Sequence, residues 1–221
     1  MNNFIKRTIS GVGFAAIMLA AFLTNKFVYG AVMLFALVVM MWEFLRMTCE
    51  KEYRYSQIIS IFAGATLFTL TWLYKAFDFP GRLIILAFVP VFILMINSLY
   101  VKDKSRFDKF ANLYTAIIYI AVPWSVINFA AFDAAGHFNG KLILSFLAII
   151  WGTDVGGYLF GITLGQKYGK KLFPSISPKK SWIGFWGGML MAIGVSLALY
   201  HVGIFPIATG NTRCDLIHCI V

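Results

Sequence analysis

The 221-residue sequence contains few charged residues and very few acidic ones. Only 13% of the residues are charged, with nine Asp and Glu against 19 Lys and Arg. Because soluble domains carry about 25% charged residues, the composition excludes an ordinary soluble fold, and the 60% hydrophobic content indicates an integral membrane protein. The net charge of +10 does not indicate nucleic-acid binding, because the basic residues lie in short connections between apolar stretches.

Cysteine and histidine are also scarce, with three residues of each. Cys49, Cys214 and Cys219 lack the spacing of a metal or redox motif, and the three histidines lie far apart in the sequence. The sequence has no internal repeat, low-complexity segment or soluble domain. We therefore expect a single transmembrane helical domain over residues 1–205, followed by an atypical polar tail over residues 206–221.

Seven apolar stretches come close to the roughly 20 residues that a helix needs to cross a bilayer. They predict an all-α polytopic membrane bundle with about seven transmembrane helices, over residues 8–25, 27–45, 55–74, 83–101, 110–132, 142–166 and 181–200. Pro123 lies inside the fifth stretch, where it predicts a kink.

Lysine and arginine are unevenly divided between the connections. If the N-terminus is cytoplasmic, the cytoplasmic segments carry 14 of these residues and the opposite segments carry 5. Since cytoplasmic loops are enriched in lysine and arginine, the sequence predicts that the N-terminus and the Lys167–Lys180 loop are cytoplasmic.

Asp154 is an isolated acid within the sixth apolar stretch. An ionisable group inside a bilayer costs several kcal/mol unless it faces a partner, water or an ion. Tyr158, Gly161 and Gly165 follow it at helical spacing, and we expect this stripe to face the protein interior and to open toward the cytosol. Asp154 is therefore a candidate functional residue, whereas close helix packing also explains the glycines.

The connection after this stretch carries five lysines, Lys167, Lys170, Lys171, Lys179 and Lys180. Such a loop can serve topology or attraction to anionic lipid alone. However, Ser177 and Ser181 can cap a helix or bond phosphate oxygens, and a helix N-terminus beside lysines is a potential anion site. A carboxylate and bound phosphate are commonly bridged by a divalent cation. The combination indicates phosphoryl or nucleotidyl transfer at a membrane surface.

The stretch from Trp151 to Gly188 also resembles a known family. "DVGGYLFG" followed by "GQKYGKKLFPSISPKKSWIGFWGG" is similar to the phosphatidate cytidylyltransferases, also called CDP-diacylglycerol synthases. Upstream of Trp151, the sequence agrees with the family only in the general character of its apolar helices and in the "WEF" at Trp42–Phe44. The resemblance implies an α-helical enzyme of the bacterial inner membrane that uses CTP, phosphatidic acid and Mg²⁺ and releases CDP-diacylglycerol and pyrophosphate.

The resemblance also implies roles for individual residues. Asp154 and Lys180 would be catalytic, with Asp154 a candidate metal ligand. Substrate phosphate would be bound by Ser177, Lys179, Lys180 and Ser181. The nucleotide would be attracted by Lys167, Lys170 and Lys171. The resemblance leaves the oligomeric state open, with a homodimer as one alternative.

The sequence departs from the family pattern in two main places. Ile183 stands where the family usually has glutamate. The family motifs Lys-Asp-Ser-Gly and Pro-Gly-His-Gly-Gly do not occur in the chain. We therefore expect the domain and its metal site to be incomplete relative to the family. Whether this form of the chain catalyses the reaction stays open. The alternatives are a CTP-dependent enzyme similar to polyprenol kinases, and a transporter in which Asp154 relays a cation or proton.

Overall fold

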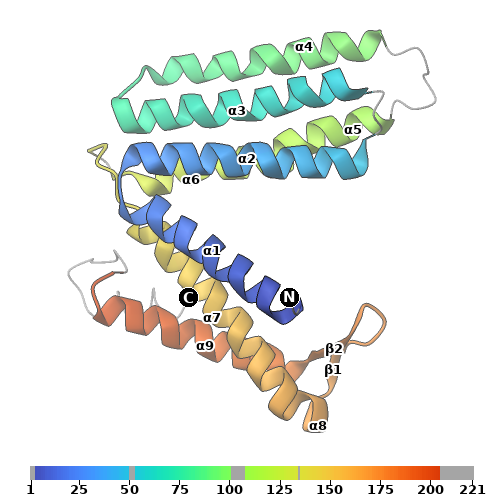
Figure 1. The fold of residues 1–221 in the computed structure, drawn as a ribbon, viewed down its shortest axis with the longest axis vertical. Helices are drawn as coiled ribbons and strands as arrows, with labels where there is room; N and C mark the ends of the chain where they lie inside the picture. The colour runs from blue at the N-terminus through green and yellow to red at the C-terminus, as the bar shows by residue number, and fades with distance from the viewer. Residues whose placement is uncertain (1–2, 50–52, 101–107, 134, 205–221) are drawn as a thin grey trace. The chain divides into compact units, whose positions relative to one another are not determined.

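The structure is a computed structural model, which describes residues 3–49, 53–100, 108–133 and 135–204. This part of the chain is almost entirely helical (Figure 1). Six of its helical stretches are long and apolar enough to cross a membrane: Lys26–Thr48, Arg54–Phe77, Gly81–Leu99, Phe110–Ala131, Lys141–Tyr168 and Trp182–His201. The expected all-α polytopic membrane fold is confirmed.

The first of the seven expected spans coincides with α1 (Asn3–Leu23), which contains a shorter apolar stretch, Gly11–Leu23. Its buried side chains Met18, Ala21 and Phe22 lie near its C-terminal end. A seventh crossing and the orientation of the N-terminus stay predictions. The expected tail over residues 206–221 lies outside the described residues.

Contacts divide the chain into two compact units, Met1–Gly140 and Lys141–Val221. In the first unit, α3 (Arg54–Phe77) packs against α2 (Lys26–Thr48), α4 (Phe88–Leu99) and α6 (Val122–Ala131). Figure 1 shows α2, α3 and α4 lying side by side. The remaining elements are a 3-10 segment, η2 (Gly81–Ala87), the short helix α5 (Asp108–Thr115) and a π-helical segment, η4 (Ala116–Ala121).

A buried hydrogen-bond network joins three of these helices. The Tyr29 hydroxyl donates to Asn128 Oδ1 at 2.9 Å. The Asn128 amide donates to Thr71 Oγ1 at 2.9 Å and to the Phe68 carbonyl at 3.3 Å. Asn128 is completely buried, and its side chain therefore links α2, α3 and α6 through hydrogen bonds that satisfy its polar atoms in an apolar interior.

The kink expected at Pro123 stays a prediction, but the helical turns widen just before this proline, in the π-helical segment η4. A proline inside an α-helix removes one hydrogen bond, and its ring collides with the carbonyl four residues earlier. The segment Ala116–Ala121 ends directly before α6, in which proline occupies the first turn, and the Val122 N–H bonds back to the Ile117 carbonyl. The wider turn accommodates the proline within one continuous helical path.

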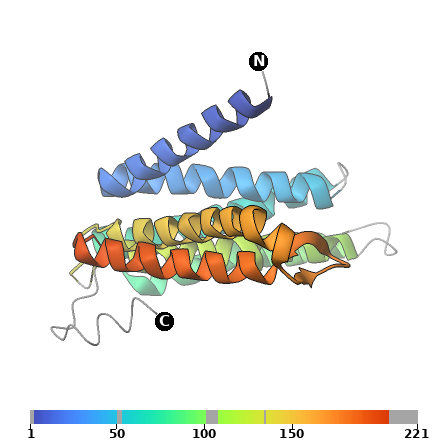
Figure 2. The same cartoon turned by 90° about the horizontal axis from the view of Figure 1, so that it is seen from below.

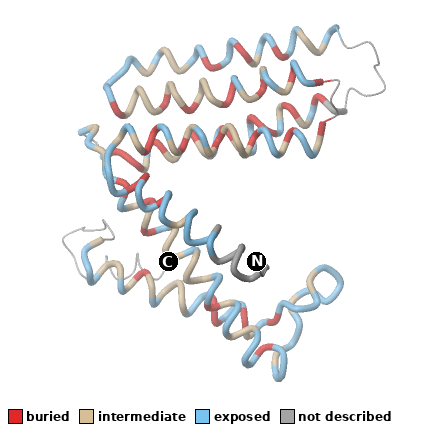
Figure 3. Tube along the Cα trace, viewed as in Figure 1, coloured by how far each residue is buried: buried red, intermediate tan, exposed pale blue. Residues whose placement is uncertain are grey.

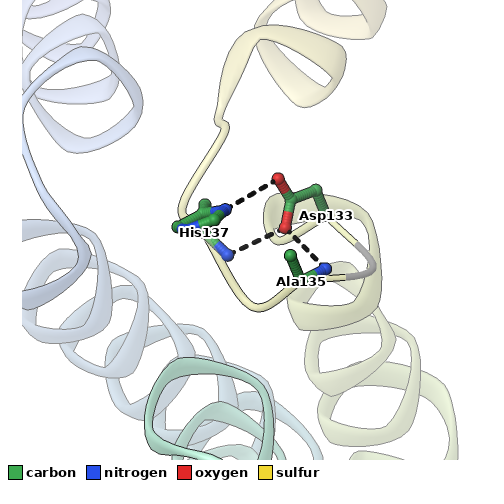
Figure 4. Close-up of polar contacts among 3 residues, drawn as sticks. All are labelled: Asp133, Ala135 and His137. Carbon is green, nitrogen blue, oxygen red and sulfur yellow. Dashed lines mark hydrogen bonds and ion pairs between the residues drawn. The ribbon is translucent and has the colours of Figure 1, made fainter.

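The connection between α6 and α7 (Lys141–Phe160) is organised by Asp133. Its carboxylate accepts hydrogen bonds from the backbone N–H groups of Ala135 at 2.9 Å and His137 at 2.8 Å, and lies 3.3 Å from His137 Nδ1 (Figure 4). The backbone hydrogen bond from His137 lowers the pKa of Asp133. Because the folded pKa is lowered, this carboxylate stabilises the turn at neutral pH, and the effect is lost as the pH falls through the lowered pKa.

The described part of the second unit, residues 141–204, consists of two long helical segments joined by a β-hairpin. The first segment contains α7 (Lys141–Phe160), the π-helical η5 (Gly161–Gly165) and α8 (Gln166–Tyr168), and the second is α9 (Trp182–His201). The strands β1 (Lys171–Phe173) and β2 (Ser177–Ser181) are antiparallel, with Lys171 opposite Ser181 and Phe173 opposite Ser177. The hairpin was not expected from the sequence, which indicated an irregular loop.

The helices α7 and α9 pack with backbone against backbone. A Cβ atom added at Gly156 would lie 2.8 Å from the Gly187 carbonyl oxygen, and one added at Gly184 would lie 3.0 Å from the Gly157 carbonyl oxygen. Figure 2 shows the two helices side by side, and Figure 3 shows buried residues where they meet near the hairpin. The packing role expected for the glycines is confirmed, since only residues without a side chain permit this approach.

We predict that Asn128→Ala will lower the free energy of unfolding by about 1–3 kcal/mol, because buried partners lose their hydrogen bonds. Thermal unfolding in detergent micelles measures the change. Thr66→Ala on α3 is the control, since its hydroxyl bonds only to Phe62 within the same helix. Equal stability of the Asn128 variant and the control would contradict the proposed importance of the network.

We also predict that Gly156→Ala will destabilise the second unit by about 1–3 kcal/mol, the usual cost of overpacking. The new methyl group meets a backbone carbonyl, so the two helices must separate. Gly194→Ala is a matched control on α9, because a Cβ there has no atom within 4 Å. A loss of thermal stability at Gly194 as large as that at Gly156 would exclude the close contact as the cause.

Candidate functional site

All candidate residues lie in the second unit, and the hairpin brings the lysines together. Lys167 lies in α8, Lys171 in β1, and Lys179 and Lys180 in β2, while Lys170 directly precedes β1. The Lys170 carbonyl accepts a hydrogen bond from the Trp182 N–H at 3.0 Å. This bond holds the base of the hairpin against the first residue of α9, so that the lysines gather at one end of the two long helices.

The lysines form an uncompensated positive cluster. All five side chains are exposed, and the sequence contains no acidic residue between Asp154 and Asp215. Within the described residues, no acidic side chain forms an ion pair with them. Exposed ammonium groups without carboxylate partners are available to a polyanion such as a triphosphate.

Ser181 has a structural role in this arrangement. Its hydroxyl accepts a hydrogen bond from the Gly184 N–H at 3.2 Å, which caps α9 as expected. The side chain is only 3% exposed and lies against Gly165 and Gly169. A hydroxyl buried in this way positions the hairpin on η5 and α8, and it presents little surface to a substrate.

The N-terminus of α9 offers fewer free amides than the sequence suggested. The Trp182 N–H already donates to Lys170, and the Gly184 N–H already donates to Ser181. Lys179 and Lys180 lie in β2 and not in the helix itself, while Ser177 is half-buried at the start of the same strand. Lysine side chains are therefore more available to an anion at this end of the unit than the backbone amides of the helix terminus.

Asp154 lies apart from the lysine cluster. Gly165, which packs against Ser181, follows it by 11 residues, which is roughly 16 Å along a helix. Asp154 and Tyr158 are exposed on the second unit, whereas Gly165 is buried. Packing within the second unit therefore does not cover Asp154 and Tyr158, although the sequence predicted that this stripe faces the protein interior. Among the described residues, no three His, Cys, Asp or Glu side chains form a group that could hold a metal ion.

Two further features adjoin the cluster. Ile183, at the position where the family pattern has glutamate, is half-buried in the first turn of α9, so this turn has no acidic side chain. Phe173 and Ile176 flank the hairpin turn with 59% and 83% of their surface exposed. The sequence analysis did not predict this apolar tip, and its only signal was the presence of Leu172, Phe173 and Ile176 between the two lysine pairs.

Comparison with known proteins identifies the family of the chain. The chain matches the cytidylyltransferase family over residues 5–212. It is 28% identical over 209 residues to the phosphatidate cytidylyltransferase of Bacillus subtilis, and the alignment covers 94% of this chain and 75% of that protein. The phosphatidate cytidylyltransferase of Staphylococcus epidermidis is 35% identical over 92 residues, covering 42% of this chain and 34% of that protein. That of Staphylococcus aureus is 34% identical over 94 residues, covering 42% and 35%. With a family match that includes both units and the lysine hairpin, the chain belongs to the cytidylyltransferase family.

Proposed function

We propose that the chain is a phosphatidate cytidylyltransferase, which forms CDP-diacylglycerol and pyrophosphate from CTP and phosphatidic acid. The observation that carries this proposal is the cluster of five exposed lysines, without acidic partners among the described residues, on and beside the hairpin that joins two candidate membrane spans. A membrane-bound substrate and a soluble triphosphate can meet only at such a boundary. The family membership and the similarity to phosphatidate cytidylyltransferases support the same reaction.

In the proposed reaction, a phosphate oxygen of phosphatidic acid attacks the α-phosphorus of CTP. A new phosphorus–oxygen bond forms, the bond from the α-phosphorus to the bridging oxygen of the β-phosphate breaks, and pyrophosphate leaves. Two anionic reactants must approach each other, and negative charge develops on the leaving group. Positioned cations reduce the repulsion between the two reactants and stabilise the charge on the leaving group, which is the main form of catalysis in phosphoryl-type transfer.

The lysines divide into two proposed roles. Lys179 and Lys180 on β2 bind substrate phosphate, with Lys180 contacting the reacting groups and Ser177 donating a hydroxyl beside them. Lys167, Lys170 and Lys171 raise the local concentration of the nucleotide and steer it to the hairpin. Because Ser181 is buried and caps α9, its proposed contribution to phosphate binding is to hold the backbone of β2 in place.

Mg²⁺ is proposed as the cofactor, with Asp154 as one ligand. Mg²⁺ is commonly held by one or two carboxylates together with substrate phosphates and water, and the exposed carboxylate of Asp154 fits such a partial site. When bound, the ion would neutralise charge on the phosphates. Asp154 lies in α7, several helical turns from the hairpin lysines. An ion that contacts both Asp154 and the nucleotide would therefore require the nucleotide phosphates to extend from the hairpin along α7.

The proposed setting is the bacterial inner membrane, with the lysine hairpin on the cytoplasmic side, where CTP is available. This placement follows from the excess of lysine and arginine in the same set of connections. A homodimer is also compatible with the proposal, and its presence is measurable by the mass of the purified protein in detergent.

The reaction is tested with membranes from cells that express the protein, supplied with α-labelled CTP, phosphatidic acid and Mg²⁺. We expect labelled CDP-diacylglycerol above the level in membranes from cells without it. Binding of labelled CTP to the purified protein is measured in parallel. Absence of both the lipid product and CTP binding would overturn the proposal, and CTP-dependent phosphorylation of a polyprenol would point to a kinase instead.

We predict that Lys180→Ala will reduce formation of CDP-diacylglycerol on the order of 100-fold, as expected for loss of one stabilising group at the reacting phosphates. Lys75→Ala is the control, because it removes the same charge at the end of α3. Unchanged turnover in the Lys180 variant would remove this residue from the site. Equal losses in both variants would show a general effect of charge.

We predict that Asp154→Asn will lower activity and raise the Mg²⁺ concentration needed for half-maximal rate, while thermal stability stays unchanged. The asparagine has the same size but lacks the charge that binds a cation. Stability is expected to persist because Asp154 is exposed on α7 and its carboxylate has no bonding partner in the described part of the chain. An unaltered Mg²⁺ dependence would exclude Asp154 as a metal ligand.

A further inference from the structure

We propose that the β1–β2 hairpin is an anchor in the membrane interface, with its tip inserted among the lipids of an anionic leaflet. The tip consists of Phe173, Pro174, Ser175 and Ile176, and all four residues are exposed. The occupant of this surface is the lipid bilayer in which the protein itself resides. The proposal concerns how the hairpin is held, and it does not depend on the reaction that the lysines serve.

The position of the hairpin is set by the helices on either side. One candidate span ends at Tyr168 and the next begins at Trp182, so only residues 169–181 separate them. The Lys170–Trp182 backbone hydrogen bond, 3.0 Å long, fixes the base of the hairpin at the start of α9. A strand advances about 3.3 Å per residue, and the tip therefore stays within roughly 10–15 Å of the membrane boundary.

Aromatic residues at the two helix ends mark the level of that boundary. Tyr168 ends α8 with 79% of its surface exposed, and Trp182 begins α9 with 47% exposed. Tyrosine and tryptophan favour the headgroup region, where an apolar ring and a polar tip are both accommodated. Their occurrence on both sides of the hairpin indicates that its base lies at headgroup depth.

The side chains of the hairpin match the layers of an anionic lipid surface. Phe173 and Ile176 provide the apolar tip, and the Ile176 N–H closes the turn by bonding to the Phe173 carbonyl at 3.2 Å. Behind the tip lie two pairs of lysines, Lys170–Lys171 and Lys179–Lys180, one pair on each arm. Apolar groups inserted among acyl chains, with lysines at the level of lipid phosphates, are the usual combination in interfacial membrane binding.

Charge complementarity distinguishes lipid from a protein partner. The hairpin and its flanking turns carry five lysines and no acid, so a protein partner would have to present a concentrated acidic surface together with an apolar pocket. The leaflet next to these helices offers both properties continuously and at high concentration. Two exposed large apolar side chains so close to a bilayer are better accommodated in it than in water.

The proposal is tested by measuring the depth of the tip in vesicles. The three native cysteines are replaced, Ser175→Cys is labelled with an environment-sensitive fluorophore, and the full chain is reconstituted into vesicles of phosphatidylglycerol and phosphatidylcholine. Ala135→Cys, on the exposed turn capped by Asp133, is the control. We expect quenching by shallow brominated lipids to be several times greater at position 175 and to increase with the phosphatidylglycerol fraction.

A second variant shows which side chains insert. Phe173→Ser together with Ile176→Ser should reduce lipid quenching at position 175 to the control level, while thermal stability in detergent is retained. Quenching at position 175 by aqueous iodide as strong as at position 135 would overturn the proposal, because the tip would then lie in water. A blue-shifted probe that lipids do not quench would also overturn it, because the tip would then pack against protein. Neither readout depends on CTP or on turnover.

Discussion

The backbone contact between α7 and α9 is the constraint on which the candidate site depends. Gly156 and Gly187 leave room for this close approach, with the Met191 side chain against Gly156 and the Phe160 side chain against Gly187, and the close packing continues through Gly157, Gly161 and Gly184 to the hairpin end. There, Gly165 and Gly169 leave just enough room for Ser181. Because Ser181 both caps α9 and begins the pairing with Lys171, helix packing determines where β2 and its lysines are placed.

This arrangement separates two kinds of charge. The positive charge is concentrated on and beside a short, hydrogen-bonded hairpin, while Asp154 lies in α7, about three helical turns before Gly165. The amides that begin α9 are largely used by the hairpin and by the cap. The proposed binding of a nucleotide therefore depends on lysine side chains, and the proposed role of Asp154 requires a ligand that extends along the helix. A membrane enzyme with one soluble and one lipid substrate gains from such an elongated site.

The sequence predicted the parts of this structure that depend on local pattern. Apolar length located the six candidate spans, the glycine spacing indicated close packing, and Ser181 was recognised as a possible cap. The hairpin could not be predicted, because Lys171–Phe173 is too short to show alternation and Pro178 argues against a strand. It depends instead on the contact between Lys170 and Trp182, which are far from adjacent in sequence. The environment of Asp154 likewise depends on tertiary packing that helical spacing alone does not determine.

The central claim is that the hairpin lysines bind the phosphates of CTP. Chemical footprinting tests it directly, by acetylating the reconstituted protein with and without saturating CTP and quantifying each modified lysine by mass spectrometry. We expect strong protection of Lys179 and Lys180 by CTP, weaker protection of Lys167, Lys170 and Lys171, and none at Lys75. Equal acetylation of the hairpin lysines in the presence and absence of bound CTP would contradict it.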